Sequence, residues 1–501
     1  MSAPRAGPSP DRLPSRSGQS GSARRPPGKH WFLALADATC APSAAATLGV
    51  DRVLLHVASE DSVFARFNRS AVRQLTRVDQ REATVSLVRG RRRIAATVDL
   101  GGDIDADIAS LRALRDGLAR DLALVPEDPH LRLPEVVVDT DRDDGDPGDA
   151  VYAATRQAPA ATGASEGMDA DGTTTTLRAV VDQVVTEARG LDFVGIHVDG
   201  PVVAAFADSR GQRNWHRVRQ HQLDWSLFCQ GDPATRGRAV KSRLAGRRWD
   251  ADAFTRRMAL ARSRLALLER PPVPLAPGAR RAWLEPAAVA DMLGMLAWSG
   301  FGLKDRRTGT SALGMLVDGD AALSPLFRLT EATADGIAPL FTRTGQVKPD
   351  AVLLVDGGRD AGALVSPRSA AEFGVEANAD ESETPSSLAL SAGTLDPAQA
   401  AALVGTGLVV GNLWYLNWSD RQRCRMTGMT RFACFRVEGG ELLGPIEPMR
   451  FDDSFLRLFG ESLVGLAGDA QAMPSDDTYG RRHLGSITAP SALLADMRFT
   501  S

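Results

Sequence analysis

The sequence is poor in residues that mark several classes of protein. Its 501 residues include only 4 cysteines, 7 histidines and 3 tyrosines. The cysteines form no C-x-x-C pair and no close cluster, being Cys40, Cys229, Cys424 and Cys434. This spacing argues against a disulfide framework or a structural zinc knuckle. Reduced thiols fit a cytoplasmic protein best, and a cytoplasmic location is our prediction.

Long apolar runs are also lacking. No stretch reaches the roughly 20 residues that a membrane helix needs, and the N-terminus has no hydrophobic core of a signal peptide. The net charge of −3 at pH 7 argues against a dedicated nucleic-acid-binding protein. We therefore expect neither a membrane nor a nucleic-acid partner.

The histidines do not form a metal-binding pattern. Only His216 and His221 lie close together, and their separation of five residues puts them on opposite faces of a strand. A zinc pair on a helix needs a spacing of four, as in H-E-x-x-H. Because Arg213, Arg217 and Arg219 lie beside them, this segment is predicted to be a solvated polar strand.

Other candidate motifs also favour structural roles. No G-x-S-x-G, G-x-G-x-x-G or P-loop spacing is present, and the segment from Asp356 to Asp360 is interpreted as a turn after a strand. A basic stretch from Arg236 to Arg248, flanked by Trp225 and Trp249, could bind single-stranded nucleic acid. A charged surface segment is the favoured interpretation.

The length implies two or three domains, and the patterning predicts an α+β protein. We expect an N-terminal region of mixed sheets with helices, followed by a β-rich C-terminal domain. Composition divides the chain into a disordered tail at 1–29, an N-terminal α+β domain at 30–134, a linker or insertion at 135–176, a middle α/β region at 177–270, a β-rich C-terminal domain at 280–468 and a C-terminal tail at 469–501.

Apolar periodicity places the main elements. Short strands are predicted at 53–57, 64–68, 84–88, 94–98, 192–198 and 202–206, with a turn around Gly90. Helices are predicted at 105–124, 177–189, 249–269 and 287–299.

The C-terminal region contains the most distinctive stretch. Residues 409–418 and 432–437 are predicted strands, and the glycines of Glu438-Gly439-Gly440-Glu441 suit a hairpin turn. Between the two strands, Arg425, Thr427, Gly428 and Arg431 interrupt an otherwise apolar region. We predict that their face lies at or near a functional cleft or subunit interface. The alternative is an ordinary surface turn.

These segments resemble the TldD/PmbA family. The similarity is carried by 425–441, by Asp208-Ser209-Arg210-Gly211 and by the segment from Trp283 to Leu293, and it covers roughly residues 30–468. In that family, TldD-type chains carry an H-E-x-x-x-H zinc helix at the start of the C-terminal domain, whereas TldE/PmbA-type chains do not. The corresponding segment here has no histidine, and its acidic residues are Glu285 and Asp291.

The resemblance therefore implies the TldE/PmbA-like branch. That branch supplies the metal-free partner of a TldD-type, zinc-binding subunit in a heterodimeric metallopeptidase acting on unfolded peptides. We accordingly expect no catalytic residue, no metal ligand and no cofactor in this chain, with zinc in the partner. Two alternatives remain open at this stage, a stand-alone regulatory or peptide-binding protein and a hydrolase with an unrecognised site.

Overall fold

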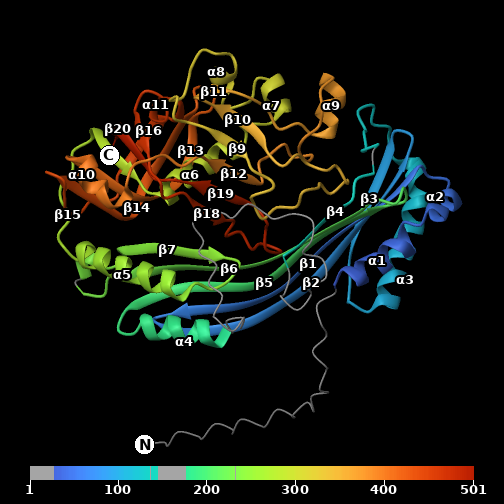
Figure 1. Cartoon of the computed structure of the whole chain (residues 1–501), viewed down its shortest axis with the longest axis horizontal. Helices are drawn as coiled ribbons and strands as arrows, with labels where there is room; N and C mark the ends of the chain where they lie inside the picture. Colours follow the sequence, from blue (N-terminus) through green and yellow to red (C-terminus); the bar gives the residue numbers. More distant parts are fainter. Residues whose placement is uncertain (1–27, 136, 145–176, 232, 501) are drawn as a thin grey trace, which may run out of the picture.

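The computed structural model describes residues 28–135, 137–144, 177–231 and 233–500. The predicted tail at 1–29 lies outside these residues except for its last two, and so does most of the predicted insertion at 135–176. The described chain forms a long, twisted sheet on which the C-terminal domain lies (Figure 1). The predicted α+β class is confirmed.

One seven-stranded sheet dominates the N-terminal half, in the order β3-β2-β1-β5-β6-β4, with β7 also paired to β6. Its strands are β1 (Arg52–Asn68), β2 (Ala71–Arg89), β3 (Arg92–Asp99), β4 (Thr140–Asp144), β5 (Asp192–Asp208), β6 (Arg213–Phe228) and β7 (Ala239–Gly246). Because β1 pairs with β5 from Leu54 to Phe67, the regions predicted at 30–134 and 177–270 share one sheet. The predicted short strands at 53–57 and 64–68 merge into the single strand β1.

Helices cover one face of this sheet at its two ends (Figure 1). One end packs against α1 (Lys29–Thr39), α2 (Pro42–Leu48) and α3 (Ile104–Asp121), which is followed by η1 (Leu122–Leu124). The other end packs against α4 (Leu177–Glu187) and α5 (Ala251–Leu268). Along the chain, the short helix η2 (Pro233–Thr235) connects β6 to β7. The predicted helix at 105–124 is confirmed, and Asp103 caps it by accepting the Ala106 N–H at 3.1 Å.

The C-terminal domain contains two sheets. The first has six strands in the order β11-β10-β9-β12-β19-β18. These are β9 (Leu329–Glu331), β10 (Val352–Asp356), β11 (Arg359–Asp360), β12 (Ser387–Leu390), β18 (Gln471–Pro474) and β19 (Ser486–Ala489).

The second sheet closes on itself. Its path β13-β8-β20-β16-β14-β15 is joined by an additional pairing of β13 with β14, and β17 pairs with β20. The strands are β8 (Gly278–Leu284), β13 (Gly407–Asp420), β14 (Arg425–Glu438), β15 (Glu441–Pro445), β16 (Arg450–Ser454), β17 (Leu463–Leu466) and β20 (Ala492–Phe499). The predicted hairpin is confirmed, since Gly439 and Gly440 turn β14 into β15 with φ of 58° and 85°.

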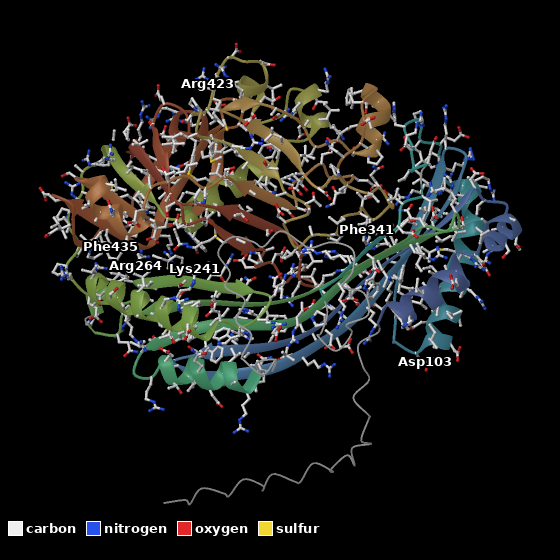
Figure 2. The ribbon with its side chains drawn as sticks, in the orientation of Figure 1. Asp103, Lys241, Arg264, Phe341, Arg423 and Phe435 are labelled. Atoms are coloured by element: carbon white, nitrogen blue, oxygen red, sulfur yellow. The ribbon has the colours of Figure 1, made fainter. Side chains whose placement is uncertain are left out.

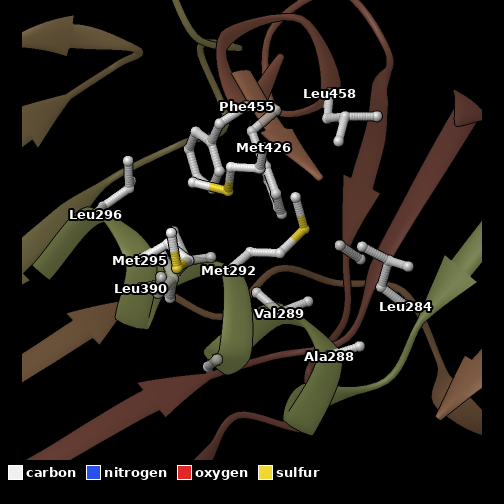
Figure 3. Close-up of a cluster of buried hydrophobic side chains, with 14 of the residues drawn as sticks. Leu284, Ala288, Val289, Met292, Met295, Leu296, Leu390, Met426, Phe455 and Leu458 are labelled. Carbon is white, nitrogen blue, oxygen red and sulfur yellow. The ribbon is translucent and has the colours of Figure 1, made fainter. Parts of the chain in front are cut away.

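The main core of the C-terminal domain surrounds α6 (Pro286–Ala297), whose Ala288, Val289, Met292 and Leu296 pack with Met426 and other apolar side chains (Figure 3). Shorter helices connect the strands. They are α7 (Leu303–Arg307), α8 (Gly314–Val317), α9 (Pro367–Phe373), η3 (Pro397–Gln399), α10 (Ala400–Val404) and α11 (Phe455–Leu458).

Residues 469–501, predicted as a tail, instead supply structural strands. β20 pairs with β8 in the closed sheet, and β18 and β19 extend the other sheet. Leu493, Leu494 and Met497 are buried, which explains why this end of the chain is ordered. Among the described residues, no helix has the length and apolar character needed to cross a membrane.

Candidate functional site

The helix α6 starts the C-terminal domain, where the family resemblance leads us to look for a zinc helix, but its side chains serve other purposes. It contains no histidine, and its apolar residues face the core. Its one acidic residue, Asp291, and the preceding Glu285 both have hydrogen-bonding partners. No cluster of metal-ligating side chains occurs in the part of the chain that the structure describes. The residues of α6 therefore do not fit a zinc ion.

Glu285, directly before α6, forms a two-point ion pair with Arg264 of α5. Arg264 Nη1 lies 2.8 Å from Glu285 Oε2, and Nη2 contacts the other carboxylate oxygen. Burial opposes the charge of Arg264, but the neighbouring carboxylate raises its pKa above the ordinary value. Figure 2 shows Arg264, Lys241 and Phe435 near one another where α5 and β7 meet the C-terminal domain.

Asp291 lies on α6 near the same junction. Its carboxylate accepts the Leu413 N–H at 3.1 Å. Burial raises its pKa from 3.8 to about 6, although that hydrogen bond and the positive charges of Lys241 and Arg243 oppose the rise. Asp291, the acidic residue of α6, therefore changes its protonation state near pH 6.

Of the four residues singled out on β14, Gly428 faces the core and the other three face outward. Arg425 pairs with Asp452 on β16 and also donates to the Asp452 carbonyl at 3.2 Å. Thr427 donates to the Phe451 carbonyl at 3.1 Å and accepts from Arg450 Nε at 3.1 Å. Both side chains thus contribute to the pairing of β14 with β16.

Gly428 points to the opposite, interior face of β14. A Cβ atom there would lie 2.8 Å from the Phe451 ring and 3.2 Å from the Trp414 carbonyl oxygen. The sequence-based expectation of close approach at this glycine agrees with that geometry. Its side of the strand belongs to the core, so the structure does not bring it together with the other three.

Arg431 lies at an exposed aromatic surface that we define as Trp414, Tyr415, Met429 and Arg431. The Arg431 guanidinium lies 5.4 Å from the centroid of the Trp414 ring, and Trp414 pairs with Met429 across β13 and β14. Exposed fractions are 48% for Trp414, 80% for Tyr415 and 38% for Met429. Tyr415 has φ of 59°, in the left-handed region that favours glycine. An exposed aromatic held in such a conformation suits binding more than packing.

The sequence pattern does not indicate this aromatic surface. The apolar and aromatic content of the run from Val409 to Trp418 predicts a strand. Trp414 faces outward because it alternates with the buried Leu413, and the pairing of β13 with β14 becomes irregular only after it, between Trp414 and Asn417, where Tyr415 is exposed. Composition does not reveal such an irregularity.

The prediction of a solvated strand around His216 and His221 is wrong, because both side chains are buried. As predicted, they lie on opposite faces of β6. His216 Nε2 lies 3.0 Å from the Ile337 carbonyl oxygen of the C-terminal domain, whereas His221 packs against His197 and Trp249. Burial lowers the pKa of His216 to about 3 and that of His197 to about 4, which keeps them neutral near pH 7.

The basic stretch of 236–248 connects parts of the protein. Arg238 pairs with Glu447, and Arg243 pairs with both Asp224 and Asp476. Both arginines therefore link β7 and its preceding loop to the C-terminal domain. The sequence favours a charged surface segment here, whereas these two arginines are largely shielded and make structural ion pairs.

One serine lies close to a lysine, as in some hydrolases. Lys348 Nζ lies 3.1 Å from Ser386 Oγ, and burial lowers the pKa of this lysine. The Ser386 hydroxyl, however, donates to Glu331, as do the backbone N–H groups of Ser386 and Ser387. Because Glu331 takes the donors that would stabilise an oxyanion, this group does not support nucleophilic catalysis.

Comparisons with known proteins agree with the sequence resemblance. Residues 277–501 match the family described as the PmbA/TldA metallopeptidase C-terminal domain. No curated protein sequence matches this chain.

Three solved structures share the fold. TldE from Thermococcus kodakarensis aligns with a TM-score of 0.71 and 12% identity over 91% of this chain and 98% of its own. A proposed modulator of DNA gyrase from Thermotoga maritima aligns with a TM-score of 0.68 and 12% identity over 94% and 100%. Another proposed modulator of DNA gyrase, from Bacteroides thetaiotaomicron, aligns with a TM-score of 0.67 and 15% identity over 94% and 98%. At these identities the alignments establish a common fold, which extends well beyond the matched C-terminal domain.

Proposed function

Because this chain belongs to the PmbA/TldD family through its C-terminal domain and has a TldE-like fold, we propose that it is the metal-free subunit of a heterodimeric, cytoplasmic zinc metallopeptidase. The observation that carries this proposal is α6. A catalytic zinc site needs about three protein ligands and an open position. This helix offers no histidine, and Glu285 is bound to Arg264 while Asp291 accepts the Leu413 N–H. In the proposed complex, the TldD-type subunit holds the zinc and supplies its chemistry.

The role of this chain would be to bind the substrate. The aromatic surface offers two flat rings, a methionine and a guanidinium, all on the outer face of β13 and β14. Aromatic and methionine side chains adapt to different apolar residues, and an extended peptide can also pair with strand backbone. These features suit unfolded peptide segments of varied sequence. Arg425 and Thr427 hold β14 in place by donating hydrogen bonds to backbone carbonyls of β16. Gly428 lets the Phe451 ring pack closely against the interior face of β14.

The test is to express this chain together with a TldD-type chain of the same organism, one that carries H-E-x-x-x-H. We expect the two chains to copurify and to cleave an unstructured peptide such as reduced, unfolded β-casein, with little cleavage by either chain alone. Absence of a complex would favour a stand-alone binding protein. Cleavage by this chain alone would favour a hydrolase with an unrecognised site.

A further inference from the structure

The strand β2 has a long unpaired edge. On one side it pairs with β1 over nearly its whole length, from Ala71 to Val88. On the other side β3 pairs only with the part from Glu82 to Arg89. Within the described residues, no strand pairs with this side of 71–81, and only its last residue is engaged, since the Arg81 carbonyl accepts the Leu100 N–H at 3.0 Å. All residues from Ala71 to Arg77 are exposed, so the free backbone donors and acceptors of this edge are accessible.

Two features leave most of this edge open to strand pairing. It has no proline, and its one irregularity opposite Arg66 and Phe67 leaves the segment from Gln74 to Arg81 in regular register. It also presents apolar side chains, since Leu75 is 58% and Val72 39% exposed. A long edge with exposed apolar residues is a ready site for another strand.

The charge of the edge indicates what kind of strand fits. The segment 69–81 has four arginines and a single carboxylate, Asp79. Arg77 is paired with Asp61 and Arg81 with Asp79. Arg69 and Arg73 have no carboxylate within 4.0 Å among the described residues, which leaves the edge basic. Like charges on adjacent strands repel, whereas opposite charges stabilise the pairing. An acidic strand is therefore favoured over a second copy of this chain.

We propose that residues 71–81 of β2 pair with an acidic edge strand of the catalytic partner subunit. This inference rests on the heterodimer proposed above. In the large sheet, β2 lies on one side of β1, and β5, β6 and β7 follow in turn on the other side. The aromatic surface belongs to that other side, because β14 contacts β7. Subunit pairing at β2 therefore leaves the aromatic surface accessible to peptides.

Hydrogen exchange of the wild-type chain, alone and bound to the H-E-x-x-x-H subunit, tests the proposal without any substitution. We expect those amides of 71–80 that point away from β1 to exchange quickly in the free chain and to become protected in the complex. A complex that forms without protecting these amides overturns this inference and leaves the proposed function standing. Absence of any complex overturns both. Concentration-dependent protection in the isolated chain would show self-pairing and would also overturn the choice of partner.

Two substitutions test the chemistry of the edge. Leu75→Glu and Arg73→Glu add negative charge at exposed positions, and we expect each to weaken the complex about tenfold or more, equivalent to about 1.4 kcal/mol. The matched control is Leu260→Glu on α5, because Leu260 is 52% exposed and lies away from the edge. Equal effects of Leu75→Glu and Leu260→Glu would contradict the assignment, and circular dichroism would verify that all three variants are folded.

Discussion

The ion pair between Arg264 and Glu285 joins α5 of the N-terminal half to the residue that precedes α6 in the C-terminal domain. Both side chains are largely shielded from solvent, with exposed fractions of 23% and 19%. The pair thus fixes the start of α6 against the helix that covers the end of the large sheet. It also occupies the carboxylate that could otherwise have served as a metal ligand.

Removing one partner of this pair should destabilise the protein more than removing both. Arg264→Met leaves the Glu285 carboxylate without its partner, and we expect a loss of about 3 kcal/mol in the free energy of unfolding. In the double variant Arg264→Met/Glu285→Gln, part of this loss should be recovered. Urea unfolding of the single and double variants measures the effect. If the loss in the free energy of unfolding in the double variant equals the sum of the losses from Arg264→Met and Glu285→Gln alone, the structural account is wrong.

Asp291 predicts a defined pH dependence. Its folded pKa of about 6 lies above the ordinary value of 3.8. Well below pH 3.8 the carboxyl is neutral in both the folded and the unfolded chain, and its burial costs no stability. Between about pH 4 and 6 the unfolded chain releases this proton while the folded chain retains it, so stability falls as pH rises. Above pH 6 the full cost of roughly 2–3 kcal/mol is present.

Asp291→Asn removes this titration and keeps an oxygen that can accept the Leu413 N–H. We therefore expect the variant to gain stability relative to the wild type as the pH rises from 4.5 to 7.5, with most of the change below pH 6.5. Urea unfolding across this range measures the difference. A difference that does not vary with pH would show that burial does not raise this pKa.

Gly428→Ala should destabilise the closed sheet. The new methyl group would lie too close to the Phe451 ring and the Trp414 carbonyl, and such overpacking costs about 1–3 kcal/mol. The control is Gly314→Ala, because no atom lies within 4 Å of a Cβ at that glycine. Thermal unfolding compares the two variants. Equal melting temperatures would mean that β16 can move away from β14 at little cost.

The aromatic surface should affect substrate binding and not assembly. In the complex with the zinc-bearing subunit, we expect Arg431→Ala or Tyr415→Ala to raise KM for an unfolded peptide about three- to fivefold, which corresponds to roughly 0.5–1 kcal/mol. Arg425→Ala should have a smaller effect on KM, since Arg425 already binds Asp452.

The control for this prediction is Arg423→Ala, because the Arg423 side chain is 80% exposed and lies outside the aromatic surface. Complex formation is measured in parallel by size-exclusion chromatography. If Arg431→Ala and Tyr415→Ala assemble and cleave like the wild type, the aromatic surface does not bind substrate.

Local signals in the sequence were sufficient for many elements. The two glycines after Glu438 predicted the hairpin because a tight turn needs positive φ, and the spacing of leucines predicted α3 because one face of that helix is buried. The absence of histidine from α6 could also be read directly. These features depend on neighbouring residues, and the sequence contains that information.

Features that depend on distant residues could not be predicted in this way. His216 is buried because a loop more than 100 residues away, containing Ile337, covers it. β1 pairs with β5 across a separation of similar size, which joined two predicted regions into one sheet. The outward turn of Tyr415 depends on a local irregularity in strand pairing. Neither composition nor periodicity reports such long-range or irregular contacts.

Metal analysis tests the central claim most directly. The chain is purified alone and in complex with the H-E-x-x-x-H subunit, and zinc is measured in both samples after exhaustive dialysis. The account predicts less than about 0.1 zinc per isolated chain and about one zinc per heterodimer, as expected for a single catalytic site. About one tightly held zinc in the isolated chain would contradict the assignment of this protein as the metal-free subunit.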